Sequence, residues 1–164
     1  MILLSVATTE PQKPSRSLQD PPWESLPPET GAALRPGPVA DFGSVLRLSA
    51  VGMPNGGEAK RYAFRSTDRG ATWTYTGVVP SAQDELVFLT STHWLQIVPP
   101  DRSQETTDAG GSWHAFKTDY QQAAPVAPQI GFGDANTGYA TVRGQLQRTT
   151  DGGAHWTSLK TPGT

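Results

Sequence analysis

The 164-residue chain contains no cysteine, which excludes a disulfide framework and a thiolate metal site. It has no run of the ~20 apolar residues that a membrane-spanning helix needs, and no block of like charge. Its net charge of −2 argues against nucleic acid as the main partner. The opening segment 1–7 is too short for the apolar region of a signal peptide and has no basic residue before it, so we recognise no export signal.

Glycine and proline are abundant instead. The chain has 17 glycines and 15 prolines, about a fifth of its residues, against an average of ~12%. No stretch has the period of an amphipathic helix, so the composition predicts an all-β fold of short strands joined by many turns. Eight of the prolines lie between Pro11 and Pro38. Because proline cannot donate to a strand ladder, residues 1–37 are predicted to be a Pro-rich linker or irregular arm.

Beyond this arm the chain repeats one pattern, Ser/Thr-Thr-Asp-x-Gly-x-x-Trp, at residues 66–73, 106–113 and 149–156. The position before the tryptophan is Thr72 in the first copy and Ser112 in the second, while His155 departs from the pattern in the third. The tryptophans are 40 and 43 residues apart. That spacing is typical of a propeller blade made of four strands.

Each repeat also contains four strand candidates, three before the motif and one that begins at its tryptophan. The first candidates share a phenylalanine: Phe42, Phe88 and Phe132. The second share a large apolar residue six or seven positions later: Leu48, Trp94 and Tyr139. We therefore expect a β-propeller segment of about three four-stranded antiparallel blades, at about 38–79, 80–120 and 125–161, with residues 1–37 as the arm.

The three motifs resemble the Asp-box, or BNR repeat, of sialidases and related propellers. The segment 130–140 also resembles repeats of bacterial propellers of the photosystem II assembly or stability factor type. The resemblance covers about 120 residues. It implies that the motif joins a blade's third and fourth strands, away from the active-site face, and that it is structural. It also implies an exported or periplasmic location.

The residue types of the motif fit a sharp hairpin. Glycine adopts a positive φ without a steric penalty, and aspartate accepts hydrogen bonds from main-chain amides within a turn. The carboxylates lie on different blades and lack the dense oxygen-ligand spacing of a calcium loop, so we predict no metal site. The structural Asp-box residues are predicted to be Ser66, Asp68, Gly70, Trp73, Thr106, Asp108, Gly110, Trp113, Thr149, Asp151, Gly153 and Trp156.

No catalytic set is found, and no cofactor is predicted. Sialidases have a Phe-Arg-Ile-Pro signature, but Phe64 and Arg65 are followed by the first motif. Asp119 and Tyr120 are an adjacent acid and phenol, and we expect them to point to opposite faces of a strand. Carboxylates outside the motifs are interpreted as solvated loop charges, although a glycosidase would need two of them across a cleft. They are Asp84, Glu85, Asp101, Asp119 and Asp134.

The three histidines, His93, His114 and His155, are isolated in the sequence, which favours structural or surface roles over zinc binding. Trp94 lies outside the motifs and their following strands. It is expected to fill the core of the second blade, and the alternative is a residue that stacks on a sugar or peptide.

Three blades do not close a propeller, since four to eight are typical. We expect the chain to be part of a larger propeller or to self-associate, and residues 23–27 resemble the outer strand of a fourth blade. The favoured function is a non-catalytic module that binds or scaffolds a protein or glycan partner. One alternative is a fragment of a sialidase-like or xyloglucanase-like glycoside hydrolase whose catalytic residues lie mostly outside this chain. A truncated reading frame without independent function is a third.

Overall fold

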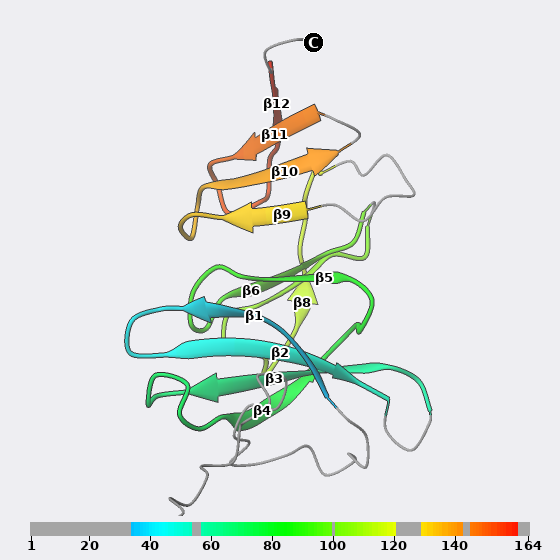
Figure 1. Cartoon of the computed structure of the whole chain (residues 1–164). Coiled ribbons are helices and arrows are strands. Elements are labelled where there is room, and N and C mark those ends of the chain that lie inside the picture. Colours follow the sequence, from blue (N-terminus) through cyan, green and yellow to red (C-terminus); the bar gives the residue numbers. More distant parts are fainter. Residues whose placement is uncertain (1–33, 54–56, 100, 121–128, 143–144, 161–164) are drawn as a thin grey trace, which may run out of the picture.

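The computed structural model describes residues 34–53, 57–99, 101–120, 129–142 and 145–160. They form three four-stranded sheets, which lie one above another in chain order and which we call blades I, II and III (Figure 1). Within each blade neighbouring strands are antiparallel and follow the order of the sequence. The prediction of an all-β chain with three four-stranded antiparallel blades is confirmed.

Blade I has the longest strands. They are β1 (Arg35–Asp41), β2 (Leu46–Gly52), β3 (Lys60–Ser66) and β4 (Thr74–Val79). β1 begins at Arg35, inside the range 1–37 that we predicted to be the arm. Pro36 and Pro38 can belong to this strand because it lies at the edge of the sheet, and its pairing with β2 is interrupted by a register shift after Pro36. An edge strand tolerates proline, which lacks the amide donor. Residues 1–33 of the predicted arm, which include residues 23–27, lie outside the described residues.

Blade II has shorter strands than blade I. Its strands are β5 (Glu85–Phe88), β6 (Trp94–Ile97), β7 (Gln104–Thr106) and β8 (His114–Ala115).

Blade III consists of β9 (Gln129–Phe132), β10 (Gly138–Val142), β11 (Gln145–Thr149) and β12 (Thr157–Leu159).

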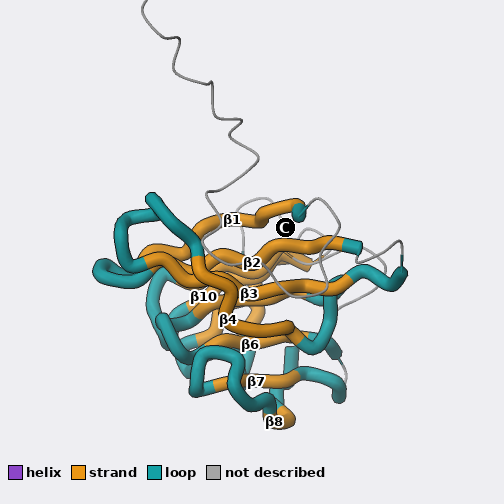
Figure 2. Tube along the Cα trace, turned by 90° about the horizontal axis from the view of Figure 1, so that it is seen from below, coloured by secondary structure: helices purple, strands orange, loops and turns teal. Residues whose placement is uncertain are grey.

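In Figure 2 the strands run across the view and the loops lie at their two ends. One end contains the β1–β2 and β3–β4 turns and their counterparts, and we call it the corner end. The other contains the β2–β3 hairpin and the connections between blades, and we call it the connection end.

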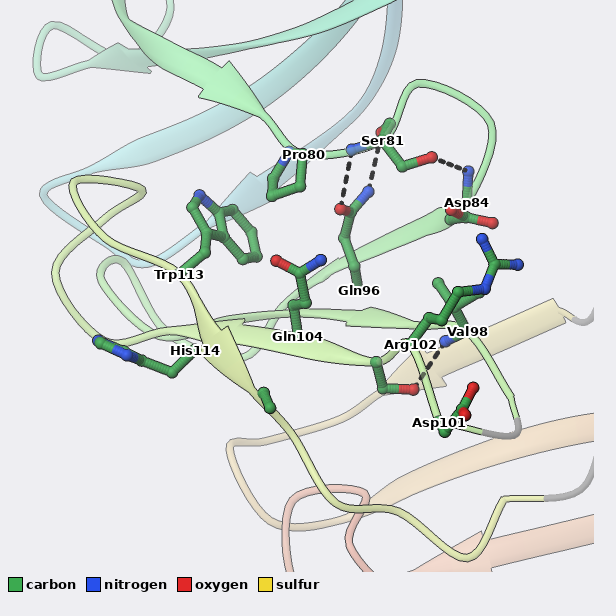
Figure 3. A pocket seen from close by; sticks show the side chains of 12 residues that line it. Pro80, Ser81, Asp84, Gln96, Val98, Asp101, Arg102, Gln104, Trp113 and His114 are labelled. Atoms are coloured by element: carbon green, nitrogen blue, oxygen red, sulfur yellow. Dashed lines mark hydrogen bonds between the residues drawn. The ribbon is translucent and has the colours of Figure 1, made fainter.

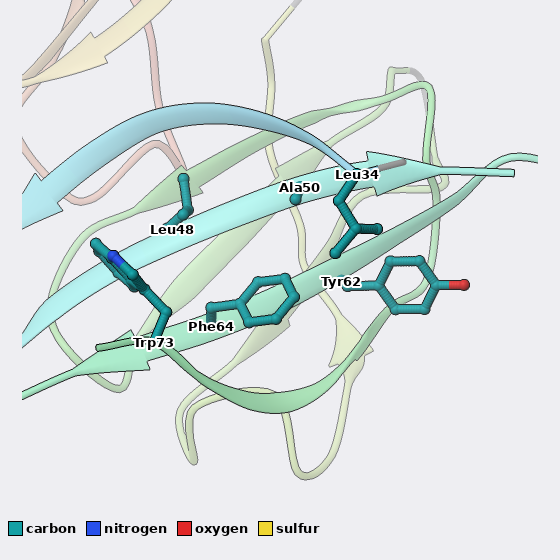
Figure 4. Close-up of a cluster of buried hydrophobic side chains, with 6 residues drawn as sticks. All are labelled: Leu34, Leu48, Ala50, Tyr62, Phe64 and Trp73. Atoms are coloured by element: carbon teal, nitrogen blue, oxygen red, sulfur yellow. The ribbon is translucent and has the colours of Figure 1, made fainter. Parts of the chain in front are cut away.

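Side chains along a strand point alternately to the two faces of its blade, so blade I contributes to two separate buried clusters, one on each face. Tyr62 and Phe64 of β3 point to one face of blade I, where they join Leu48, Ala50 and Trp73 in a buried cluster (Figure 4). Ala63, between them in sequence, points to the opposite face, as expected for a strand of period two.

The opposite face of blade I packs on blade II. Ala63 and Val79 lie in one buried cluster with Trp94, which is 0% exposed. The prediction that Trp94 fills a core is confirmed. On the far side of blade II, Leu95 and Ile97 pack against Ala140 of blade III and its neighbours.

The strand pairings show that Leu48, Trp94 and Tyr139, which we aligned from the sequence, do not occupy equivalent positions in the three blades. Trp94 pairs with Thr106, and the residues in the equivalent pairs are Leu46 in blade I and Gly138 in blade III, not Leu48 and Tyr139. The alignment fails in blade I because the turn before its second strand is shorter: the Phe42 amide bonds to the carbonyl three residues ahead, while the Leu89 amide of blade II and the Gly133 amide of blade III bond to one four residues ahead. In blade III it fails because Gly138, the register equivalent of Trp94, has no side chain and the next residue, Tyr139, is the large one. A small slip moves a side chain to the other face. Tyr139 is accordingly 44% exposed.

Candidate functional site

The motif of blade II forms a tight hydrogen-bonded corner between β7 and β8. The Thr106 hydroxyl donates to Asp108 Oδ1 at 2.7 Å and accepts from the Gly110 amide at 2.9 Å. Asp108 Oδ1 also accepts from the Ser112 amide at 2.9 Å, and Oδ2 accepts from the Ser112 hydroxyl at 2.7 Å. Asp108 therefore uses both of its carboxylate oxygens within its own turn.

The corner of blade I has the same bonds. Ser66 replaces the threonine, with its hydroxyl 2.7 Å from Asp68 Oδ1 and 2.8 Å from the Gly70 amide. Thr72 donates its amide to Oδ1 at 2.9 Å and its hydroxyl to Oδ2 at 2.8 Å.

The corner of blade III differs at one position. Thr149 and Gly153 repeat the hydroxyl–amide bond at 2.9 Å, and the His155 amide reaches Asp151 Oδ1 at 2.9 Å. The second carboxylate oxygen, however, meets the His155 ring at Nδ1, 2.6 Å away. The departure of His155 from the sequence pattern thus substitutes an imidazole for a hydroxyl in the same place.

These bonds lower the pKa of each corner carboxyl. The amide bond from Thr72, followed by the hydroxyls of the corner, lowers the pKa of Asp68 to about 2. The two bonds from Ser112 lower that of Asp108 further, and the His155 amide lowers that of Asp151 to about 2. A general acid needs a pKa near the working pH, so these groups are unsuited to acid–base catalysis near neutrality.

The corner backbone needs two successive residues with positive φ, which the sequence motif does not make obvious. Gly110 has φ +92° and Ala109 has φ +62°, and blade III places glycine at both positions. An added Cβ on Gly110 would lie 2.9 Å from Trp94 Cζ3, while one on Gly70 would be 3.6 Å from its nearest neighbours. The corner of blade II therefore sits directly on the buried Trp94 ring.

The corner tryptophans of blades II and III pack at blade junctions, while that of blade I lies on the face of blade I opposite to blade II. Trp73 is 4% exposed and belongs to the cluster of blade I. The Trp113 ring lies 6.3 Å from that of Trp94, and the Trp156 ring lies 5.2 Å from that of Tyr120.

The acid–phenol pair Asp119–Tyr120 is not on a strand, which corrects the expectation. Asp119 Oδ1 accepts from the Trp156 amide at 2.7 Å, and the Asp119 amide donates to Ala154 at 2.9 Å. Tyr120 is 2% exposed. The segment that leaves blade II therefore docks on the corner of blade III.

The structure keeps the histidines apart. His93 Nε2 lies 3.0 Å from Glu105 Oε2, His155 contacts Asp151, and His114 Nε2 lies 3.3 Å from the Ser112 hydroxyl. Across the described ranges, no three His, Cys, Asp or Glu side chains gather where they could hold a metal ion. The same ranges contain no helix long and apolar enough to cross a membrane.

A groove of about 530 Å³ opens at the connection end, between the connection from blade I and the outer part of blade II (Figure 3). Its walls come from the connection 80–84, the β6–β7 hairpin and β8. The lining residues are Pro80, Ser81, Asp84, Gln96, Val98, Asp101, Arg102, Ser103, Gln104, Trp113, His114 and Ala115.

Gln96 fixes one wall of the groove. Its side chain is 1% exposed, accepts from the Ser81 amide at 3.1 Å and donates to the Ser81 carbonyl at 2.8 Å. These two bonds satisfy the buried amide and hold the connection against blade II, as Figure 3 shows. Arg61 of blade I reinforces the connection by donating to the carbonyls of Ala82 and Asp84, at 2.9 and 3.2 Å.

Gln104, directly opposite Gln96 on β7, has a different role in the groove. Within the described part of the chain its side-chain amide makes no hydrogen bond, and it lines the groove beside Trp113. Arg102 and Asp101 add exposed charges of both signs at the hairpin. The groove thus offers a donor, an acceptor and two charges next to an apolar wall.

The glutamine pair departs from the repeat. Counted from the corner threonine, the pair Gln96–Gln104 occupies the register position of Leu48–Phe64 in blade I, where both residues are buried core. Blade III has Ala140 and Gln147 there. Sequence reasoning missed these two glutamines because they belong to no motif. An alignment of the repeats by strand register would have found them as polar residues at a core position.

Comparisons with known proteins give structural matches alone. No protein-family model matches the chain, and no curated protein does. The chain is similar to "YCF48 from Cyanidioschyzon merolae", with 15% identity over 79% of this chain and 45% of that one and a TM-score of 0.48. It is also similar to a chain described as "YCF48 bound to D1 peptide", with 19% identity over 87% of this chain and 46% of that one and a TM-score of 0.42.

The chain therefore spans less than half the length of either of these two structures. Its three sheets, each closed by the same hydrogen-bonded corner, are successive blades of one architecture. This chain is a segment of a β-propeller, with three four-stranded antiparallel blades in its described residues.

Proposed function

We propose that this chain is a binding module that holds a segment of a protein partner in the groove between blades I and II. The observation that supports the proposal is the unpartnered amide of Gln104 at a position where blade I has buried core. The equivalent pairs are Leu48–Phe64 in blade I and Ala140–Gln147 in blade III, so of the three described blades blade II is the one that has amides on both strands at this position.

The chemistry of the groove suits a peptide. A carboxamide can donate to a main-chain carbonyl and accept from a main-chain amide, as Gln96 does with Ser81. Asp84, Asp101 and Arg102 can pair with charged side chains at the rim, where such pairs contribute mainly to specificity and association rate. A glycan, the other partner class that the sequence favoured, would need a stacking ring, and Trp113 is the aromatic residue that lines the groove.

The corners have a structural role in this proposal, as the Asp-box resemblance implies. Their carboxylates are occupied by their own turns, so they set the geometry of the blades and leave recognition to the connection end. The blades missing from a closed ring would come from additional chain or from a second copy.

Peptide selection followed by mutation tests the proposal. A random peptide library displayed on phage is selected against the immobilised chain, and the affinity of synthetic copies of the enriched peptides is measured by calorimetry. Loss of a hydrogen bond to a neutral group weakens binding by about 0.5–1.5 kcal/mol, so Gln104→Ala should raise Kd by about 2- to 13-fold. Gln147→Ala, at the same register position of blade III, is the matched control and should leave Kd unchanged.

Two results would count against this function. Enriched peptides whose affinity is the same for the Gln104→Ala variant would place the binding site elsewhere. Strong and selective binding on a glycan array, lost with Trp113→Ala and kept with Gln104→Ala, would favour the glycan partner.

The glycoside hydrolase alternative has one observation in its favour, because Asp84 and Asp101 both line the groove. A hydrolase of this kind needs two carboxylates that flank the scissile bond. Turnover of aryl glycosides or sialosides that disappears in Asp84→Asn or Asp101→Asn would establish it. Absence of turnover in the parent chain would count against this alternative.

A further inference from the structure

Two arginines face each other across β2 and β3 of blade I. Arg47 pairs in register with Arg65, and the equivalent pairs are Leu95–Glu105 in blade II and Tyr139–Arg148 in blade III. Like charges directly opposite each other destabilise a sheet. Blade I thus has a doubly cationic pair at a position where the other two blades have at most one charge.

Arg47 is also buried. It is 5% exposed, its Nε donates to the Ser91 carbonyl at 2.9 Å, and its guanidinium lies 5.0 Å from the centre of the Trp94 ring. Its Nη1 is shut off from solvent and has no hydrogen-bond partner. Burial, and secondly the charge of Arg65, lowers the pKa of Arg47 to about 10, so the side chain remains a cation at neutral pH.

These arginines line a cavity of about 490 Å³ at the corner end, between blade I and the turns of blade II. Thr76, Ser91 and Thr92 also line it. Asp108 is the one carboxylate in the lining, and the corner of blade II uses both of its oxygens. In the described ranges no acidic side chain forms an ion pair with Arg47 or Arg65.

We propose that this cavity binds a small oxyanion, a carboxylate or a phosphate, between Arg65 and Arg47. A buried charge without a counterion is costly, and removing it from water is compensated only by an opposite charge or by strong hydrogen bonds. Guanidinium groups present planar, paired donors that match the oxygens of carboxylate and phosphate. The site lies at the opposite end of the strands from the groove, so it is a second binding site and does not depend on the proposed function.

The test measures the melting temperature of the full chain against increasing inorganic phosphate, with chloride added to keep the ionic strength constant. The melting temperature should rise with the logarithm of the phosphate concentration once that concentration exceeds Kd, because a ligand that binds only the folded state stabilises it by RT ln(1 + [L]/Kd). Arg65→Gln should weaken the apparent Kd by about tenfold or more, the loss of one charge-assisted contact. Arg148→Gln, which removes an exposed arginine at the same register position of blade III, should have no effect.

A second titration distinguishes the sources of the anion. Acetate and an N-acetylated glutamate peptide replace phosphate, and the cross-peaks of the arginine Nε–H groups are followed by NMR. Saturable shifts of the Arg47 Nε–H with phosphate identify a free ion, and shifts with the peptide alone identify a carboxylate of a partner. Arg47→Met should abolish the stabilisation by phosphate, and if this variant fails to fold, the Arg65→Gln variant and the NMR shifts still test the proposal. No thermal stabilisation and no saturable NMR shift with any of the three anions, or an unchanged Kd in Arg65→Gln, would overturn the proposal.

Discussion

Gly110→Ala tests the close contact between the corner of blade II and the Trp94 ring. The added Cβ meets two obstacles, a backbone at φ +92° and the ring carbon Cζ3 at 2.9 Å. The ring has no room to withdraw, since Trp94 is 0% exposed and packs against Phe88 at 5.1 Å and under the Arg47 guanidinium at 5.0 Å. Gly70→Ala is the matched control, because its φ is +83° and its nearest contacts are at 3.6 Å.

Gly110→Ala and Gly70→Ala should differ in how much each lowers the free energy of unfolding. A left-handed conformation costs an L-residue about 1–2 kcal/mol. Replacing glycine by alanine also stabilises the fold by about 0.4–1 kcal/mol, because it reduces the conformational entropy of the unfolded chain. The net cost of Gly70→Ala should therefore be about 1 kcal/mol of unfolding free energy. Overpacking against an immobile ring adds about 1–3 kcal/mol. We therefore expect Gly110→Ala to lower the free energy of unfolding by about 2–4 kcal/mol.

Urea denaturation measures this difference. With an m-value of about 2 kcal/mol/M, the midpoint for Gly110→Ala should fall by about 1 M more than that for Gly70→Ala, at an unchanged m-value. Trp94→Phe removes the crowded part of the ring, so the double variant with Gly110→Ala should lose less stability than the two single changes summed. Equal midpoints for the two glycine variants, or full additivity in the double variant, would refute the contact as the cause.

Three further predictions concern the corners. Thr106→Val removes a buried hydroxyl with two hydrogen bonds and should lower the free energy of unfolding by about 1–3 kcal/mol. The control Thr107→Val changes an exposed side chain and should alter the free energy of unfolding by less than about 0.5 kcal/mol. Equal urea midpoints for the two variants would contradict this prediction. The folded pKa of Asp68, about 2, lies below its unfolded value, so its stabilisation is present above about pH 4 and is lost as the pH falls toward 2. Asp68→Asn should reduce the slope of the urea midpoint against pH in that window, and an unchanged slope would contradict the assignment. Hydrogen bonding to Asp151 raises the pKa of His155 above its usual 6.5, so this contribution is complete below about pH 6.5 and is lost as the pH rises through the folded pKa. NMR titration should show that raised pKa, and His155→Ser should abolish the corresponding pH dependence of stability; a His155 pKa at or below 6.5 would be inconsistent with the bond.

The sequence was sufficient to predict the blades because their turns need special residues. A corner with two successive positive φ values, a carboxylate acceptor and a buried hydroxyl can be built from few residue types, so it repeats in recognisable form. The strands between the corners lack this constraint. Any apolar residue of suitable size fits a blade core, and Leu46, Trp94 and Gly138 share one register position without resembling each other.

Blade III shows why the alignment of strands could not be predicted from residue size. Gly138 has no side chain, and the Phe132 ring occupies the space beside it, 2.7 Å from where a Cβ would be. Phe132 also contacts Trp156, with ring centroids 6.1 Å apart. Blade II has Phe88 at the same first-strand position and Trp94 beside it, with ring centroids 5.1 Å apart, so two rings there correspond to one ring in blade III. A pattern based on residue size cannot detect that Gly138 is the counterpart of Trp94.

The same reasoning indicates where function resides in this chain. In a stack of repeats the corner residues are constrained by the turn, and core residues are interchangeable as long as the volume is filled. Positions that satisfy neither condition need another explanation. The pair Gln96–Gln104 is polar on both strands where each of the other blades has at least one apolar residue, and Arg47 is a buried charge where leucine is found in the next blade. Each lines a cavity at the junction of blades I and II, one at each end of the strands. Stability alone would favour apolar replacements at both positions, so we attribute both departures to ligands that this junction binds.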